Sequence, residues 1–167
     1  EVHGRGEVLL YRSSNLRDWE YLHPLIPDGI RSRLEDSADI CECPNFFALG
    51  DKYVLIFSVW RSNVLHYPVA FIGEFKDLRF YPEYMQRLDW GLYCFYAPLS
   101  FKANDRRLMF GWLQEQRTKE DQIAAGWSGV MSLPRVLSIE NNRLKIDFAP
   151  ELQTLRKEKV ELSNVTL

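Results

Sequence analysis

The sequence predicts an all-β fold, and three observations support that prediction. Short runs rich in Val, Ile, Leu, Tyr and Phe recur along the 167 residues and are separated by turn-forming residues. Aromatic residues make up 14% of the chain, and aromatic side chains favour strands. The 3.6-residue periodicity of an amphipathic helix is hard to find, and its best example is a short segment near the C-terminal end.

Each expected strand is an apolar run bounded by Gly, Pro, Asn or Asp. These runs are residues 6–13, 43–49, 52–59, 67–75, 106–113, 128–139 and 143–148. The residues expected to form turns between them are Asn15, Gly50-Asp51, Pro68, Asn104-Asp105, Gly126, Pro134 and Asn141-Asn142. The Asn141-Asn142 pair is typical of a tight hairpin. Pro150 is the best candidate for a helix start, with Leu152 and Leu155 on one face.

A faint internal repeat indicates how these strands are organised. Residues 45–57 and 95–112 each contain an aromatic segment, a turn and a second strand. Aligning Ala48 with Ala97 gives an offset of about 49 residues, within the range of β-propeller blades. The alternative is that two hairpins resemble each other by composition alone. A propeller reading gives about three blades, fewer than the minimum of about four for a closed ring. Further blades, or a second copy of the chain, would then be needed for closure.

The charge and motif content exclude several classes of partner. The formal net charge of −2 gives no electrostatic reason to expect nucleic acid or an anionic membrane surface. No apolar stretch approaches the length of a membrane-spanning helix. Phosphate-binding, dinucleotide-binding and H-E-x-x-H motifs are all absent, so no cofactor is expected.

The three cysteines do not form a disulfide framework, because their number is odd. Cys41 and Cys43 with Cys94 could bind zinc, but no further Cys or His has ligand spacing, so no metal site is expected. Three reduced, mostly buried thiols are the simpler interpretation. Reduced thiols are more typical of the cytoplasm, and the sequence otherwise leaves the cellular location open.

Glu42 gives the strongest local sign of chemistry. It lies in Cys41-Glu42-Cys43-Pro44, followed by two Phe residues, and such apolar surroundings disfavour the ionised form of a carboxyl. A carboxyl held in this way suits a general acid. Pro44 fits a strand end or an edge strand. The structural alternative is a Glu that points into solvent from an edge strand.

Three other side chains have both a sugar-binding and a structural interpretation. Asp89, beside a Trp and two residues before a Gly, suits a loop residue that reaches sugar hydroxyls, or an ordinary Asx-turn. Trp112 and Trp127 suit stacking on a sugar ring, or packing in the core.

The order of the motifs resembles glycoside hydrolase family 32, which contains invertases, sucrose-6-phosphate hydrolases, inulinases and levanases. The resemblance extends from about residue 6 to residue 157. The matching segments are residues 6–19 (LY-S-DL-W), 42–44 (ECP), 88–91 with 95–98 (DYG…FYAP), 106–112 (GRRI-GW), 126–135 (GW-G-LSLPR) and 151–156 (EL–LR).

The resemblance implies a five-bladed β-propeller followed by a β-sandwich, with the active site in the propeller funnel. It implies hydrolysis of terminal β-fructofuranosyl bonds of sucrose or fructans, with retention, by two carboxylates about 5–5.5 Å apart. Glu42 would be the acid/base that protonates the leaving oxygen and then deprotonates the attacking water. Asp89 and Trp112 match positions that the family uses around the fructosyl unit. No metal is required.

The departures from the family pattern concern the rest of the catalytic machinery. The W-x-N-D-P-x-G motif that carries the nucleophilic Asp is absent from this chain, as is the R-D-P motif of the transition-state-stabilising Asp. Asn45 stands where Asp often follows ECP, and Leu99 where Gln is frequent. We therefore expect an incomplete enzyme that is inactive in isolation. Residues 1–149 would be the C-terminal part of the propeller, and residues 150–167 a linker helix and the start of the β-sandwich.

Two other interpretations also fit the sequence. The missing nucleophile and the retained aromatic residues would also suit a non-catalytic carbohydrate-binding or assembly module derived from this propeller. A five-bladed propeller that acts on arabinan or mannosides is a further possibility, against which the order of the ECP and Leu-Pro-Arg segments argues.

Overall fold

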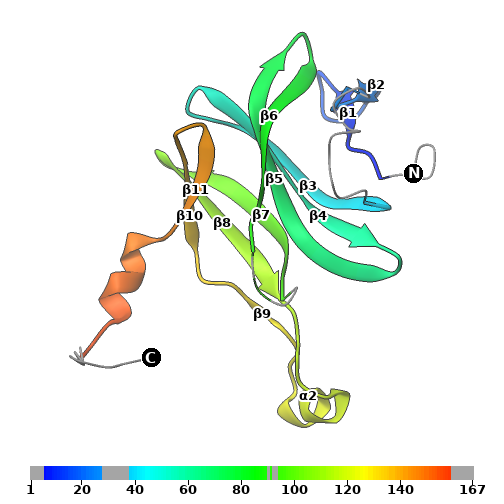
Figure 1. Cartoon of the computed structure of the whole chain (residues 1–167). Helices are drawn as coiled ribbons and strands as arrows, with labels where there is room; N and C mark the ends of the chain where they lie inside the picture. The colour runs from blue at the N-terminus through cyan, green and yellow to red at the C-terminus, as the bar shows by residue number, and fades with distance from the viewer. Residues whose placement is uncertain (1–5, 28–37, 90, 92–93, 159–167) are drawn as a thin grey trace.

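The computed structural model describes residues 6–27, 38–89, 91 and 94–158 of the chain. This part consists mainly of antiparallel strands (Figure 1). In chain order its elements are the strands β1 (Leu9–Arg12), β2 (Glu20–Pro24), β3 (Ile40–Leu49), β4 (Lys52–Arg61), β5 (Val64–Lys76), β6 (Arg79–Arg87), β7 (Phe95–Ala103) and β8 (Arg106–Leu113), the α-helix α2 (Lys119–Ala125), the strands β9 (Val130–Met131), β10 (Arg135–Glu140) and β11 (Arg143–Phe148), and the 3-10 helix η1 (Pro150–Leu155).

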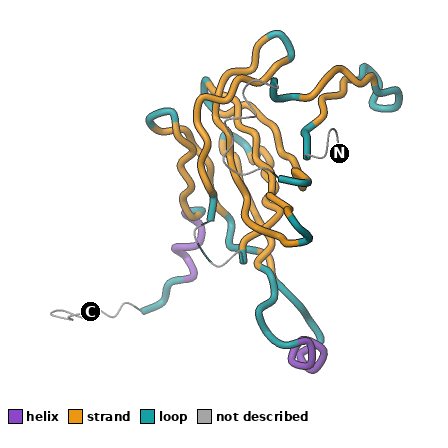
Figure 2. Tube along the Cα trace, turned by 45° about the vertical axis from the view of Figure 1, so that its right-hand side comes forward, coloured by secondary structure: helices purple, strands orange, loops and turns teal. Residues whose placement is uncertain are grey.

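Two sheets of consecutive antiparallel strands form the body of the fold. The first has the order β3-β4-β5-β6, and the second has the order β7-β8-β10-β11 with β9 paired to β8. Strands β1 and β2 form a separate hairpin next to the first sheet (Figures 1 and 2). Sheets of four strands placed side by side are the blades of a β-propeller, so the predicted partial propeller is confirmed. The described residues provide two whole blades and one additional hairpin.

Strand β4 shows why the sequence has continuous apolar runs rather than alternating ones. Val54 and Ile56 belong to the cluster that packs between the two blades. Leu55 and Phe57 belong to the opposite cluster, which includes Leu25 just after the β1–β2 hairpin. Both faces of the first blade are therefore covered, and a strand that is buried on both faces needs apolar residues at successive positions.

The internal repeat is present, but its register differs from the predicted one. The turn at residues 50–51 in the first blade corresponds to the turn at residues 104–105 in the second. Glu42 and Tyr96, which are 54 residues apart, occupy the same place in the two blades. The predicted offset of about 49 residues is therefore wrong. It is based on Phe and Ala residues that the two segments share, whereas turns and bulges set the register of a ladder.

A β-bulge occurs at the same place in the first strand of each blade. The ladder shifts directly after Glu42 in β3 and directly after Tyr96 in β7. The next residue has a left-handed backbone, with φ of 50° at Cys43 and 46° at Ala97, and a proline follows each of them. Bulges bend a strand and redirect its side chains, so Glu42 and Tyr96 are redirected in the same way.

Several predicted elements are confirmed. The Asn141-Asn142 hairpin joins Glu140 to Arg143, and both asparagines have positive φ, at 51° and 59°. These angles match the two-residue turn that Asn favours. A helix begins at Pro150 as predicted, although it is the 3-10 helix η1 rather than an α-helix.

Other sequence predictions are wrong or incomplete. Pro68 lies inside β5 rather than in a turn, and the facing ladder is irregular just after its partner Ser58. Residues 128–139 form two strands rather than one, because β9 ends before Pro134. Strands β2 and β6 and helix α2 were not predicted. Helix α2 buries no residue, so it has no apolar stripe to reveal it.

The three cysteines differ in exposure. None of them is in a disulfide, and Cys41 and Cys94 are partly buried. Cys43 is exposed, so the prediction of mostly buried thiols is wrong. The bulge explains the difference, since it removes Cys43 from the regular alternation of β3.

No helix in the described part of the chain combines the length and the apolar character needed to span a bilayer.

Candidate active site

Glu42 lies in the first half of β3, the edge strand of the first blade that lies beside β7. Its side chain is half-buried, and Oε2 accepts a hydrogen bond of 2.6 Å from the hydroxyl of Tyr96. The structural alternative for Glu42, a carboxylate directed into solvent, is therefore wrong. The edge that carries Glu42 faces the next blade, and the side chain lies where the two blades meet.

Tyr96 holds the Glu42 carboxylate from the second blade. Its side chain is almost fully buried, at 3% exposed. Burial and the hydrogen bond to Glu42 raise the pKa of the Tyr96 hydroxyl well above its usual value. The hydroxyl consequently keeps its proton at physiological pH and acts as a donor to Glu42.

A buried serine fixes the two bulges relative to each other. Ser58, which is fully buried on β4, is the cross-strand partner of Glu42. Its Oγ accepts a hydrogen bond of 2.9 Å from the backbone N–H of Ala97, the bulge residue of β7. The bulge frees this N–H from the ladder, and Ser58 satisfies it. The position of Tyr96 is thereby coupled to the strand next to Glu42.

Asn45 forms a second polar link between the blades. Its Oδ1 accepts hydrogen bonds from the backbone N–H and the hydroxyl of Ser100, at 3.0 Å and 2.5 Å. Arg107 of β8 donates to the Ser100 hydroxyl at 3.0 Å, so the hydrogen-bonded contact between the blades includes β8. Asn45, which directly follows the ECP segment, thus binds the neighbouring blade.

Trp112 lies in the same row of residues as Tyr96. It pairs with Tyr96 across the β7–β8 ladder and with Met131 on β9. Directly paired residues share one face of a sheet, so Trp112 lies next to the residue that binds Glu42. Its side chain is 39% exposed, which excludes the core interpretation.

The surroundings of Asp89 match the Asx-turn that the sequence allowed for this residue. Its Oδ2 accepts a hydrogen bond of 3.2 Å from the backbone N–H of Gly91, as in an Asx-turn. Its charge also acts on Arg135, whose guanidinium lies 4.0 Å from the centre of the Phe95 ring. Among the described residues, no hydrogen bond or ion pair joins Asp89 to Glu42.

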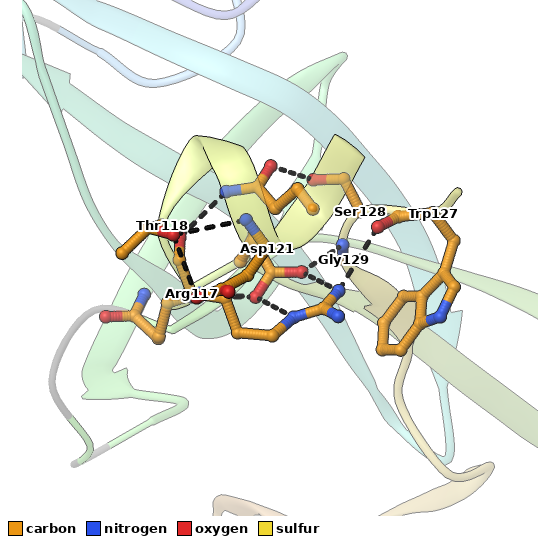
Figure 3. Close-up of polar contacts among 9 residues, drawn as sticks. Arg117, Thr118, Asp121, Trp127, Ser128 and Gly129 are labelled. Carbon is orange, nitrogen blue, oxygen red and sulfur yellow. Dashed lines mark hydrogen bonds and ion pairs between the residues drawn. The ribbon is translucent and has the colours of Figure 1, made fainter. Parts of the chain in front are cut away.

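A loop beside Trp112 contains a second polar cluster (Figure 3). Glu115 accepts hydrogen bonds from Nε and Nη2 of Arg117, at 3.0 Å and 2.6 Å. These contacts lower the pKa of Glu115 to about 2. The Arg117 guanidinium lies 3.9 Å from the centre of the Trp127 ring, and Trp127 is 54% exposed. The core interpretation of Trp127 is therefore wrong as well.

The residues that the sequence prediction overlooked are Tyr96, Ser58 and the Glu115–Arg117 pair. Tyr96 could have been found from the repeat, because aligning the two blades by their turns makes Tyr96 the equivalent of Glu42. The Glu115–Arg117 pair carries no comparable signal, because its loop has no counterpart in the first blade.

The arrangement around Glu42 suits proton transfer. Glu42 Oε2 has a fixed donor, and Oε1 has no hydrogen bond among the described residues; a carboxyl held in this way can give or take a proton. No second carboxylate is hydrogen-bonded to it, and the residues that the structure describes contain no group of three side chains suited to a metal ion. Within the described part of the chain, the Glu42 carboxylate thus has Tyr96 as its one hydrogen-bond donor.

Comparison with known proteins identifies related sequences. The family described as "Glycosyl hydrolases family 32 N-terminal domain" matches residues 1–150. A sucrose-6-phosphate hydrolase of Zymomonas mobilis is 36% identical over 98% of this chain and 34% of its own length. A sucrose-6-phosphate hydrolase of Escherichia coli is 32% identical over 97% of this chain and 35% of its own length. The chain therefore spans about a third of the length of these relatives.

Solved structures agree with the fold. A β-fructofuranosidase of Bombyx mori matches with a TM-score of 0.76 and 28% identity, over 95% of this chain and 35% of its own length. A fructan 1-exohydrolase of Cichorium intybus matches with a TM-score of 0.76 over 98% of this chain and 34% of its own length. Its identity is 24%, so it supports the fold alone.

Proposed function

Because the chain belongs to glycoside hydrolase family 32, we propose that it forms part of a retaining β-fructosidase. The reaction would cleave terminal β-fructofuranosyl bonds of sucrose or fructans. The observation that supports it most directly is the contact between Glu42 and Tyr96, which holds a carboxylate between two blades beside a tyrosine whose pKa is raised. The names of the relatives, sucrose-6-phosphate hydrolase and β-fructofuranosidase, point to the same class of substrate.

In this proposal Glu42 is the acid/base. Protonated Glu42 gives its proton to the glycosidic oxygen as the bond to the fructosyl carbon breaks. A carboxylate nucleophile forms a covalent intermediate on the opposite side, and ionised Glu42 then removes a proton from the attacking water. The nucleophile motif is absent from these 167 residues, so that carboxylate would come from other blades.

Tyr96 would position Glu42 without taking part in proton transfer. Its hydroxyl occupies Oε2 at 2.6 Å, which leaves Oε1 to face the substrate. A raised pKa keeps the tyrosine from losing its own proton to a nearby base. The acid/base is thus held in one orientation, as general acid–base catalysis requires.

Trp112 and Asp89 would contact the fructosyl unit. Trp112 is part-exposed in the row next to Tyr96, and its indole offers an apolar face to a sugar ring. Asp89 would have to give up or share its turn contact with Gly91 to bind a hydroxyl. Support for Trp112 is accordingly more direct than support for Asp89.

We also propose a boundary near residue 149. Residues 1–149 would belong to the propeller, which agrees with a family match that ends at residue 150. Residues 150–167 would lead towards a β-sandwich. The described start of that segment is η1, which the ion pair between Arg106 and Glu151, at 2.6 Å, attaches to the second blade. Residues 159–167 lie outside the described part.

Sucrose hydrolysis by the complete polypeptide that the gene encodes tests the proposal. Glu42→Gln should lower kcat by about 10²–10⁴-fold, the usual contribution of a general acid–base. Glu83→Gln removes a carboxylate of the same type that is paired with Lys52 on the first blade, and it should leave kcat unchanged. The isolated 167-residue chain should be inactive.

Two results would count against this function. Full activity in the Glu42→Gln variant would remove Glu42 from the reaction. Binding of sucrose without hydrolysis by the complete polypeptide would instead favour the alternative of a non-catalytic carbohydrate-binding module.

A further inference from the structure

The loop of residues 114–129 projects from the end of the second blade where Tyr96 and Trp112 lie. It leaves β8 at Leu113 and returns at Val130, and these two residues pair with each other. Leu113 also pairs with Phe95, the first residue of β7. The loop therefore extends past the start of β7, with α2 at its far end (Figure 1).

This loop is held in one shape by contacts within itself. The Glu115 carboxylate binds the Arg117 side chain and also accepts from the backbone N–H of Gly129 at 3.2 Å. Arg117 Nη2 donates to the backbone carbonyl of Trp127 at 3.1 Å. Figure 3 shows that these contacts join the outgoing and returning halves of the loop.

The ends of helix α2 are fixed as well. Thr118 Oγ1 accepts from the backbone N–H of Asp121 at its start. Gly126 ends the helix with a left-handed φ of 75°, which Gly adopts without strain. Gln122 donates to the backbone carbonyl of Arg117 at 2.8 Å and accepts from the Ser128 hydroxyl at 2.8 Å. The loop is thus ordered by polar contacts although its helix buries no residue.

The Trp127 indole is contacted by Arg117 and is still exposed to solvent. Arg117 lies over the ring at 3.9 Å and so fixes its orientation. More than half of the side chain remains accessible. An aromatic side chain that is ordered before binding loses little conformational entropy when a ligand stacks on it.

Trp127 and Trp112 lie at the same end of the second blade, the end that carries Tyr96, and we call this end the rim. Gly129 lies two residues after Trp127, and a side chain at Gly129 would collide with the Trp112 indole nitrogen. Gly129 also has a left-handed φ of 61°, so the returning half of the loop can pass close to Trp112 only with glycine here. Trp112 lies in β8, in the row next to Tyr96, and Trp127 lies in the loop, directly after the Gly126 cap of α2.

We propose that Trp127, positioned by Arg117, binds the sugar unit on the leaving-group side of the scissile bond. This inference rests on the proposed function, since it places the fructosyl unit beside Glu42 and Trp112. A sugar ring has apolar C–H faces and hydroxyl edges, which match an indole face beside polar loop groups. The next sugar unit of sucrose or a short fructan would lie outside the Glu42 position, towards the rim that carries Trp127.

The experiment measures steady-state kinetics on sucrose and product inhibition by fructose in the complete polypeptide. Trp127→Ala should raise KM for sucrose by about three- to tenfold, as expected for loss of one aromatic contact. Its kcat should change less than about twofold, because Glu42 and Tyr96 are untouched. The inhibition constant of fructose should not change. Trp127→Phe retains a ring and should restore most of the affinity.

Trp19→Ala is the matched control, since Trp19 is 56% exposed and lies in the loop that joins β1 to β2. It should leave KM unchanged. An unchanged KM in Trp127→Ala, or an equal loss of fructose inhibition, would overturn the inference while leaving the hydrolase function intact. A lowered melting temperature with unchanged KM would also overturn it, since Trp127 would then pack against another part of the polypeptide. No hydrolysis by the wild type would instead refute the proposed function itself.

Discussion

Replacing Tyr96 with Phe removes a single hydroxyl from the site and little else. The ring is almost fully buried, so Phe can occupy the same space. What is lost is the hydrogen bond of 2.6 Å from the hydroxyl to Glu42 Oε2. The carboxylate then has no fixed donor among the described residues.

The size of the effect follows from the charge and burial of the two partners. A hydrogen bond to a charged group contributes about 1.5–3 kcal/mol to stability. Glu42 is only half-buried, so water can replace part of the lost contact. We therefore expect Tyr96→Phe to lower the free energy of unfolding by about 1–2 kcal/mol.

Urea denaturation of the 167-residue chain measures this loss, and a double-mutant cycle with Glu42→Gln assigns it to the pair. Gln retains an acceptor oxygen but no charge, so Tyr96→Phe should lower the free energy of unfolding by less in the Glu42→Gln variant than in the wild type. We expect a coupling energy of about 0.5–1.5 kcal/mol between the two positions. In the complete polypeptide, the same change should lower kcat for sucrose about 10-fold or more, because Glu42 loses its fixed orientation.

Tyr81→Phe provides the control, because Tyr81 is 40% exposed and its hydroxyl has no hydrogen bond among the described residues. It should change stability by less than about 0.5 kcal/mol. A coupling energy near zero between positions 42 and 96 would refute the reasoning, as would an equal loss in the Tyr81 variant.

Two further changes test the rim loop and the seam between the blades. Glu115 has its pKa lowered to about 2 by Arg117, so its carboxylate stabilises the fold above about pH 4.5 and loses that effect as pH falls towards 2. The difference in free energy of unfolding between wild type and Glu115→Gln, measured in urea, should accordingly be constant above pH 5 and shrink below pH 4.5. A difference that increases as the pH is lowered would contradict this prediction. Gln86→Leu breaks two hydrogen bonds to the backbone of Leu144, at 2.7 and 3.0 Å, that link β6 to β11. It should cost about 1–3 kcal/mol, while the exposed Gln153→Leu should cost less than about 0.5 kcal/mol, both measured by urea denaturation.

Local chemistry explains which parts of the fold could be predicted. Asn141 and Asn142 tolerate positive φ, so their turn was recognisable from two residues. Strand β4 was recognisable because burial on both faces requires a continuous apolar run. Helix α2 could not be recognised, because polar contacts such as Arg117 to Glu115 order its loop. Polar contacts of this kind produce no hydrophobic periodicity in the sequence.

The candidate site was predictable in part. Glu42 was found because an acidic residue among cysteines and phenylalanines is unusual within one segment. Trp112 was found from its motif, and the structure places it across the ladder from Tyr96. Tyr96 was overlooked, since its partner lies 54 residues away and only the bulge register reveals their equivalence.

By itself, the sequence determined an all-β chain of propeller strands, one tight hairpin, and a carboxylate in apolar surroundings. These features depend on side-chain alternation and backbone preference, which act over a few residues. The tertiary structure alone decided that Glu42 meets Tyr96, that Ser58 supports the bulge between them, and that Trp127 lies on the rim. Such contacts depend on how two blades and their bulges pack in space, and no short stretch of residues specifies that arrangement.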